Sequence, residues 1–318
     1  MELLKKLYEI HSPSGREKKI KQFIKRYIRA NISDCIIESD KAGNIYITRG
    51  VSETYPCIVA HLDQVQTIHS SDFKAIETEV MIFGYSKKNR SFEGLGADDK
   101  NGIFIALKCL EKYDTIKIAL FVKEEIGCVG SYEADMGFFA DCRFVIEPDR
   151  KGAPDFITSI GFTTLCSDEF INDCNIEKFG YRETQGMMTD VLALKENGLE
   201  ISCINLSCGY YEPHTNNEFT VKADLLNCLN LVFHIIENCQ KVYPHKNQDL
   251  WNIEKYHYAP NYIDEYFELE QIVEELYDLD STITADDIFF EYSQIYKHIK
   301  LEDIEDMLFS QNRKFLNY

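Results

Sequence analysis

Four short apolar runs, each followed by acidic or imidazole side chains, constrain the fold of this chain more than any other feature. The runs and their polar successors are Cys57–Ala60 before His61 and Asp63, Ile116–Val122 before Glu124-Glu125, Arg143–Ile146 before Glu147-Pro148-Asp149, and Ile201–Leu206 before a loop that reaches His214. Continuous apolar runs of this length are typical of strands that are buried on both faces of a sheet. The chain is therefore predicted to contain a central sheet whose strands end in polar side chains.

Segments with apolar residues at helical spacing separate these runs. They lie at 2–29, where Ser12-Pro13-Ser14-Gly15 splits two helices, and at 103–110, 189–197 and 221–238. Two further short strands are expected at Cys35–Glu38 and Asn44–Thr48. Strands that alternate with helices predict a mostly parallel sheet with helices on both faces, a three-layer α/β/α sandwich. Sites in open α/β sheets form beyond the carboxyl ends of the strands, where these polar residues fall.

The character of the chain changes at Pro244, so we expect a catalytic domain over 1–243 and an acidic helical extension over 244–318. Residues 246–318 hold 17 acidic and 6 basic residues. Helical apolar spacing runs from Ile263 to Leu276, and Thr284-Ala285-Asp286-Asp287 is typical of a helix start. The extension is interpreted either as a pad packed on the core or as a segment that covers the site or docks a partner.

Charge and composition exclude several classes of partner. The formal net charge of −19 would repel nucleic acid and anionic membranes, and part of that acidity is expected to face inward as ligands. The N-terminal residues lack the apolar run of a signal peptide, and no stretch of about 18 apolar residues occurs. Eleven cysteines without CxxC pairs indicate reduced, buried thiols, which favours a cytoplasmic location.

Five segments at predicted strand ends or turns are rich in His, Asp and Glu. They are Ala60-His61-Leu62-Asp63, Gly96-Ala97-Asp98-Asp99-Lys100-Asn101-Gly102, Lys123-Glu124-Glu125-Ile126-Gly127, Glu147-Pro148-Asp149-Arg150 and Glu212-Pro213-His214-Thr215-Asn216-Asn217-Glu218. Imidazole and carboxylate suit zinc and similar ions. Singly, each has an ordinary interpretation: helix capping for Asp98-Asp99, a solvated helix start for Glu124-Glu125, and a structural histidine for His61. Their joint occurrence in this order favours one shared site.

This combination of motifs resembles the co-catalytic zinc exopeptidases and deacylases, which include the peptidase T, carboxypeptidase G and acetylornithine deacetylase group and zinc aminopeptidase relatives. The resemblance covers about residues 1–240 and is carried by HxD at His61, GADDKNG from Gly96, the Glu-Glu-Ile-Gly segment from Glu124, the late His214 and the opening Ile10–Glu17. It implies a phosphorylase/hydrolase-like zinc-peptidase core that holds two divalent metal ions. Zinc is expected, with cobalt and manganese as alternatives.

The resemblance also implies roles for individual residues. The metal ligands would be His61, Asp98, Glu125, Asp149 and His214, with Asp98 bridging both ions. Members of the group differ at the fourth of these positions, which leaves Glu147 as the alternative to the favoured Asp149.

Three further acids receive supporting or catalytic roles from the same resemblance. Asp63 would hold the His61 ring, Asp99 would be a supporting residue, and Glu124 would be the general base that takes a proton from water.

The chain departs from the peptidase T group between Asp149 and His214. Only 65 residues separate them, and these must supply core strands and helices, so no lid domain of ordinary size is expected. Lidless aminopeptidases share the remaining core. Met187-Met188-Thr189-Asp190 is interpreted either as part of the substrate pocket or as a helix N-cap preceded by core methionines.

The function that these features favour is metal-dependent hydrolysis of amide bonds by an exopeptidase, either an aminopeptidase or a di/tripeptidase. An N-acyl amino acid amidohydrolase would use the same metals and base. A non-catalytic metal-binding protein is the alternative from another class, and retention of Glu124 argues against it. The expected partners are small peptides or acyl amino acids, and the sequence says nothing of the oligomeric state.

Overall fold

The chain forms two compact units, residues 1–248 and 249–318. The structure, a computed structural model, describes residues 1–161, 163–246, 269–270, 272–273, 276–277, 283–292, 296, 299–301, 303–305 and 307–308. The sequence placed the domain boundary at 243/244. Pro244 forms a bridge with Ile201, and the His245 amide donates to the carbonyl of Glu200, so both residues pack with the first unit.

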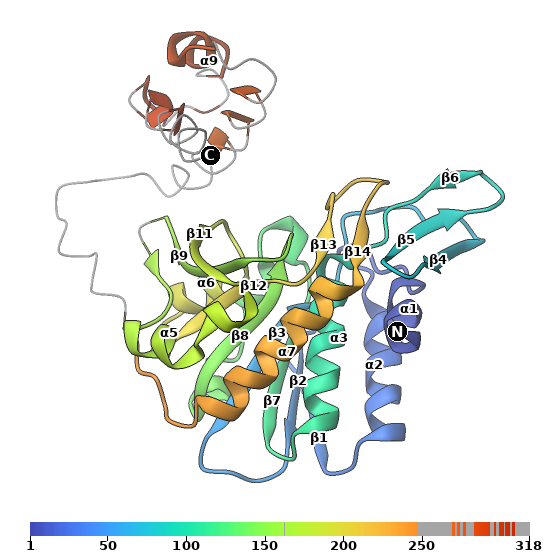
Figure 1. Ribbon diagram of the computed structural model, residues 1–318, viewed down its shortest axis with the longest axis vertical. Coiled ribbons are helices and arrows are strands. Elements are labelled where there is room, and N and C mark those ends of the chain that lie inside the picture. The colour runs from blue at the N-terminus through green and yellow to red at the C-terminus, as the bar shows by residue number, and fades with distance from the viewer. Residues whose placement is uncertain are drawn as a thin grey trace. The chain divides into compact units, whose positions relative to one another are not determined.

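A nine-stranded sheet forms the centre of the first unit (Figure 1). Its strand order is β1-β2-β7-β3-β8-β12-β9-β10, and β11 pairs with β9. The strands are β1 (Cys35–Ser39), β2 (Ile45–Arg49), β3 (Tyr55–His61), β7 (Ile116–Phe121), β8 (Cys142–Arg150), β9 (Asp155–Ile160), β10 (Thr163–Thr164), β11 (Arg182–Gly186) and β12 (Cys203–Ser207). The four strands β7, β3, β8 and β12 are parallel to one another.

Alternation of side chains along the central strands builds a core on each face of this sheet. On β3, Ile58 and Ala60 join the larger apolar cluster, whereas Cys57 and Val59 join the smaller one. The larger core lies under α1 (Glu2–Tyr8), α2 (Lys18–Asn31), α3 (Ala97–Lys112), α5 (Asp168–Cys174) and α7 (Lys222–Asn238). The smaller core is covered by α6 (Asp190–Glu196), with α4 (Val129–Tyr132) beside α6. These layers confirm the predicted α/β/α fold class (Figure 1).

Most pairings at the margins of the sheet are antiparallel, although β11 pairs parallel with β9. β1 pairs antiparallel with β2, β2 with β7, and β9 with both β12 and β10. Between Asp149 and His214 the chain forms β9, β10, α5, β11, α6 and β12, and then the two-residue strand β13 (Tyr210–Tyr211). All of these except β13 belong to the central sheet or its covering helices.

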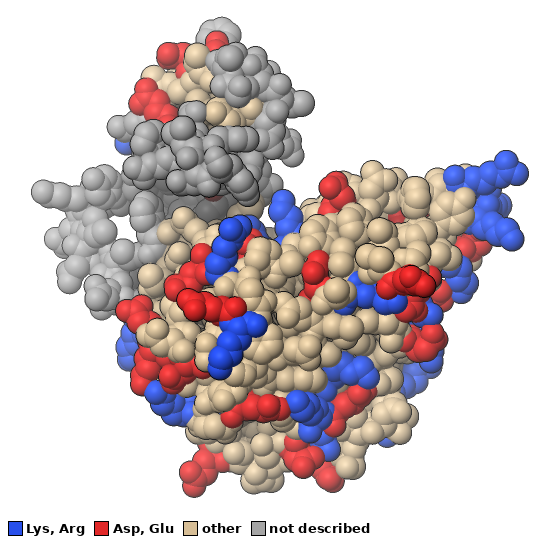
Figure 2. All heavy atoms as spheres, in the orientation of Figure 1, with Lys and Arg blue, Asp and Glu red and all other residues tan. Residues whose placement is uncertain are grey.

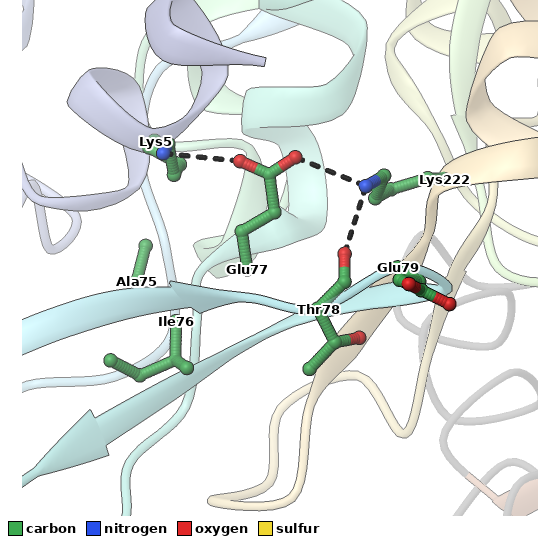
Figure 3. A pocket seen from close by; sticks show the side chains of 7 residues that line it. All are labelled: Lys5, Ala75, Ile76, Glu77, Thr78, Glu79 and Lys222. Carbon is green, nitrogen blue, oxygen red and sulfur yellow. Dashed lines mark hydrogen bonds and ion pairs between the residues drawn. The ribbon is translucent and has the colours of Figure 1, made fainter.

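A second, five-stranded sheet lies beside the first and was not predicted. It consists of β4 (Phe73–Glu77), β5 (Met81–Ser86), β6 (Ser91–Phe92), β13 and β14 (Phe219–Val221). Glu77 ties it to the helices, because its carboxylate lies 3.1 Å from Lys5 Nζ of α1 and 3.0 Å from Lys222 Nζ of α7 (Figure 3). These contacts anchor the sheet that carries the loop from residue 212 to 218.

The second unit has its own small apolar core. Leu269, Val273, Ile288 and Ile304 are among its buried members. The helix expected from Thr284 is confirmed as α9 (Ala285–Tyr292), and the Asp287 amide donates to Thr284 Oγ1 at 3.3 Å while Asp287 Oδ2 accepts from the Thr284 amide at 3.3 Å. This reciprocal pair is a capping box. The predicted positions from Ile263 to Phe267 lie outside the described residues.

The surface and interior agree with the composition. Acidic and basic side chains are interspersed over the face of the first unit in Figure 2, and several carboxylates are buried, among them Asp63, Asp99, Glu147, Asp190 and Glu218. All eleven cysteines are free, and all except Cys35 are buried. Of the helices in the described part of the chain, none is both long enough and apolar enough to cross a membrane.

Candidate metal centre

The carboxyl ends of three parallel strands bring the predicted site residues together. His61 is the last residue of β3, Glu124-Glu125 follow β7 in a 3₁₀ turn, and Asp149 lies near the end of β8. Because β3 lies between β7 and β8 in the sheet, these three ends are neighbours. Asp98 enters from the first turn of α3, and His214 enters from the loop between β13 and β14.

The first cluster joins His61, Asp98 and Asp149. His61 Nε2 lies 2.9 Å from Asp98 Oδ1 and 3.6 Å from Asp149 Oδ1. One atom from each of the three side chains lies within 4.8 Å of the others, an arrangement that can hold a metal ion. The His61 side chain is wholly buried, so this cluster forms the inner part of the site.

The second cluster shares Asp98 with the first. His214 Nε2 lies 3.3 Å from Asp98 Oδ2 and 3.1 Å from Glu125 Oε2, and these three groups also lie within 4.8 Å of one another. The His214 side chain is 51% exposed. The second cluster is therefore open to solvent at His214, whereas its two carboxylates are largely covered.

Glu124 lies beside the clusters without belonging to either. Its Oε2 is 3.9 Å from His61 Nε2, and its Oε1 accepts a weak hydrogen bond from Cys128 Sγ at 3.3 Å. Among the described residues, neither group of candidate ligands includes it. Glu124 is thus a partly buried carboxylate next to the clusters with capacity to accept a proton.

Asp63 fixes the loops around the site. Its carboxylate accepts hydrogen bonds from the backbone amides of Glu124 and Glu125 at 3.0 and 3.3 Å, and from Ser14 Oγ at 2.7 Å. Asp63 Oδ1 lies 3.6 Å from His61 Nδ1, on the far side of the ring from Asp98. The hydrogen bonds of Asp63 position the turn that carries both glutamates, and its role toward the His61 ring stays a prediction.

The two acidic residues of the Gly96–Gly102 segment have different partners: one caps a helix and the other faces the candidate site. Asp99 Oδ1 accepts from the Gly102 amide at 2.8 Å, which caps the regular part of α3, while Asp98 points at both histidines. Asp99 Oδ2 also accepts from the His61 amide at 3.3 Å, and the peptide bond between the two acids is cis. Asp99 thus matches the capping interpretation of the motif, while Asp98 belongs to both groups of candidate ligands.

Glu147 and Asp149, the two alternatives for the fourth ligand, face different partners. Glu147 is fully buried and accepts from Thr189 Oγ1 at 2.6 Å and from the amides of Asp190 and Val191, both at 3.2 Å. It thus caps the N-terminus of α6. Asp149 is the residue that reaches the first cluster.

The segment Met187–Asp190 matches its capping interpretation in part. Thr189 occupies the N-cap position of α6, but its hydroxyl donates to Glu147 instead of accepting from the helix. The part of this alternative that places both methionines in the core does not hold, because Met188 is exposed. The Asp190 carboxylate is buried against Ser131 Oγ at 2.5 Å.

The surroundings displace the pKa values of the site groups. Burial lowers the pKa of His61, but the carboxylates of Asp149, Asp63 and Asp98 reverse this and raise it well above its usual value. Hydrogen bonds to Asp98 and Glu125 raise the pKa of His214 to about 10. Burial raises the pKa of Glu124 and Asp149 well above the usual range. A set of buried carboxylates around two imidazoles is stabilised by a cation, since protonation is otherwise needed to offset the charge.

The donor set fits divalent cations. Both clusters combine imidazole with carboxylate, as zinc sites and related sites do. Among the described side chains, Glu125 Oε1 is a buried atom without a hydrogen-bond partner. The two clusters share Asp98, and each is a group of side chains that could hold a metal ion.

Two residues that help to build the site were not assigned a role from the sequence. Glu218 accepts hydrogen bonds from the amides of Gly96, Ala97 and Asp98. The Asn205 side chain makes two hydrogen bonds to the backbone of Asp149. Its Oδ1 accepts from the Asp149 amide at 3.1 Å, and its Nδ2 donates to the Asp149 carbonyl at 3.0 Å. Neither residue stands out in the sequence, although Glu218 does lie in the same acidic segment as His214.

Comparison with known proteins identifies the fold but no sequence family. No protein-family model matches the chain, and no curated protein does. Aminopeptidase PepT from Bacillus cereus is similar in structure, with a TM-score of 0.62 and 15% identity over 76% of this chain and 98% of that chain. A tripeptidase from Staphylococcus aureus gives 0.59 and 15% over 74% and 96%, and an aminopeptidase from Desulfurococcus kamchatkensis gives 0.55 and 17% over 76% and 96%. The chain therefore shares its fold with solved structures of aminopeptidases and a tripeptidase.

Proposed function

We propose that this chain is a metal-dependent exopeptidase that removes residues from small peptides with two divalent cations and Glu124 as general base. The observation that carries the proposal is the shared Asp98 carboxylate. Its two oxygens face two separate groups of ligands, while Glu124 lies beside the first group with its Oε2 3.9 Å from His61 Nε2. This layout supports hydrolysis over simple metal storage, because a storage site has no need of an adjacent proton acceptor.

The ligands and the general base would have distinct roles. His61, Asp98 and Asp149 would hold one cation, and Asp98, Glu125 and His214 would hold the other. When bound, such a pair of ions acidifies water and polarises a carbonyl group. Glu124 takes the proton from the attacking water and delivers it to the leaving amine. Asp63 keeps the backbone of Glu124 and Glu125 in place through its two amide hydrogen bonds.

The exposed side of the site is consistent with short substrates. His214 is the exposed ligand, and the segment between Asp149 and His214 is used for the central sheet and its helices. We propose that the chain has no lid domain and that the site is open to the end of a peptide. The similar solved structures are described as aminopeptidases and a tripeptidase, which supports cleavage from the amino end.

Metal content and substrate range test this function together. The full chain should retain two equivalents of zinc, cobalt or manganese after dialysis and should release amino-terminal residues from a library of di- to pentapeptides. A parallel panel of N-acyl amino acids separates a peptidase from a deacylase. Two bound ions without turnover of either panel would contradict an enzymatic role, and cleavage of the acyl panel alone would contradict the peptidase assignment.

A further inference from the structure

Glu218 makes an unusual set of contacts for a residue outside both clusters. Its carboxylate accepts hydrogen bonds from three consecutive backbone amides, those of Gly96 at 2.5 Å, Ala97 at 3.0 Å and Asp98 at 3.2 Å. Only 1% of the residue is exposed. Buried carboxylate–amide hydrogen bonds are among the stronger ones in proteins, so the backbone of Asp98 is held firmly.

The same residue also belongs to the loop that carries His214. Glu218 lies four residues after His214 and directly before β14, which is paired with β5 and β13. One carboxylate thus links the loop of Asp98 to the loop of His214. Asn101 of the same segment also bonds Thr220 of β14 at 3.2 Å, but it is Glu218 that bonds the backbone amide of Asp98 itself.

Neighbouring polar groups hold Glu218 from the other side. Gln66 Nε2 donates to Glu218 Oε2 at 3.2 Å, and Gln64 Nε2 donates to Gln66 Oε1 at 3.0 Å. The buried Lys100 Nζ donates to Gln64 Oε1 and lies near the Glu218 carboxylate. The network therefore fixes the carboxylate in position.

Close packing leaves this network little freedom. Gly96 has a φ of +65°, and a Cβ atom at this position would lie 2.8 Å from Gln64 Nε2 and 2.9 Å from Lys100 Nζ. A glycine is thus required where the loop turns into the Glu218 carboxylate. The loop of Asp98 and its polar support are fitted to each other.

We propose that Glu218 is a positioning residue that sets the distance between Asp98 and His214 and thereby the cation affinity of the Asp98–Glu125–His214 cluster. This inference rests on the proposed two-metal function. His61 and Asp149 of the other cluster are fixed by β3, β8 and Asn205, which Glu218 does not contact in the described structure. Because Asp98 belongs to both clusters but His214 belongs only to the second, loss of Glu218 should weaken the second cation site more than the first, whereas a purely structural role would affect both alike.

The test is a cobalt titration of the full chain, followed by the visible absorption of the ion and by calorimetry. Wild type should bind two ions, and His214→Ala identifies which binding step belongs to the second cluster. Glu218→Gln keeps the size of the side chain but presents an NH₂ group to backbone donors. The variant should bind the ion of the second cluster about 10- to 100-fold more weakly, as loss of a group that orients a ligand does. The affinity of the other cluster for its ion should change far less. Glu212→Gln, the same change at an exposed position of the same loop, should behave as wild type.

The titration of the Glu218→Gln variant either supports or overturns the inference. Two unchanged steps in folded Glu218→Gln, or equal weakening of both, would overturn the inference. If circular dichroism shows that this variant does not fold, Gln66→Met decides instead. It removes one hydrogen bond to Glu218 and should weaken the same step by about five-fold, and an unchanged step overturns the inference. Fewer than two ions on wild type would instead refute the proposed function, which separates the two failures.

Discussion

Asp98 and His214 are in contact through one oxygen of the Asp98 carboxylate. The other oxygen of the same carboxylate faces His61. Asp98 Oδ2 lies 3.3 Å from His214 Nε2, and Asp98 Oδ1 lies 2.9 Å from His61 Nε2. We therefore expect Asp98→Asn to weaken the binding of both cations by at least about 100-fold, because it removes the negative charge that both clusters share. Zinc content after dialysis measures this. Asp114→Asn, at a residue whose side chain is 93% exposed, is the control and should keep both ions. Loss of a single ion would show that Asp98 serves one site.

Glu124→Gln should separate metal binding from turnover. Because Glu124 lies outside both clusters, the variant should keep two ions. Its kcat should fall by about 10²- to 10⁴-fold, which is the usual contribution of a general base. Steady-state kinetics on a cleaved peptide, with metal content measured on the same sample, checks both expectations. A kcat within a few-fold of wild type would assign the proton transfer to another group.

Asp149 and Glu147 should respond differently to the same loss of charge. Asp149→Asn should lose one ion with little change in the stability of the metal-free chain. Glu147→Gln should keep both ions, but it should destabilise the fold by about 1–3 kcal/mol, because one amide oxygen cannot serve all three buried donors at the start of α6. Urea denaturation in the presence of a chelator, together with metal analysis, distinguishes them. The opposite pattern would make Glu147 the ligand.

His69 should contribute to acid sensitivity outside the candidate centre. Its ring is stacked between His11 and Phe73, with centroid distances of 4.6 and 4.0 Å, and burial lowers its pKa to about 3. The unfolded chain binds a proton at this imidazole below about pH 6.5, whereas the folded chain does not. Stability supplied by neutral His69 is therefore complete above pH 6.5 and declines as the pH falls towards 3.

His69→Gln removes this titration and keeps a donor for the Gly94 carbonyl. Urea midpoints at pH 7.5 and 5.0 should show a smaller decline for the variant than for wild type, by about 1–2 kcal/mol at one pKa unit per 1.4 kcal/mol. Parallel declines would mean that other groups dominate the acid response.

The central strands and their polar ends could be predicted from local sequence. Runs such as Ile116–Val122 are apolar on both faces because helices cover both faces of the sheet, and the predicted fold class is confirmed. The small sheet was missed because β4 and β5 are short and half-buried. The burial of these strands depends on β14, which lies more than 130 residues away in the sequence and pairs with β5.

Residue type and order along the chain determined the fold class and the list of candidate ligands, since a buried strand and a carboxylate at its end are both local features. Tertiary structure alone decided which of Glu147 and Asp149 faces the first cluster. Along a regular strand the two would share a face, but the register of β8 against β12 shifts between Glu147 and Arg150, and Asn205 holds the backbone of Asp149 there. A bulge of this kind redirects a side chain. It depends on a partner strand nearly 60 residues further along the chain, so the sequence favours Asp149 only through the family resemblance and leaves Glu147 open.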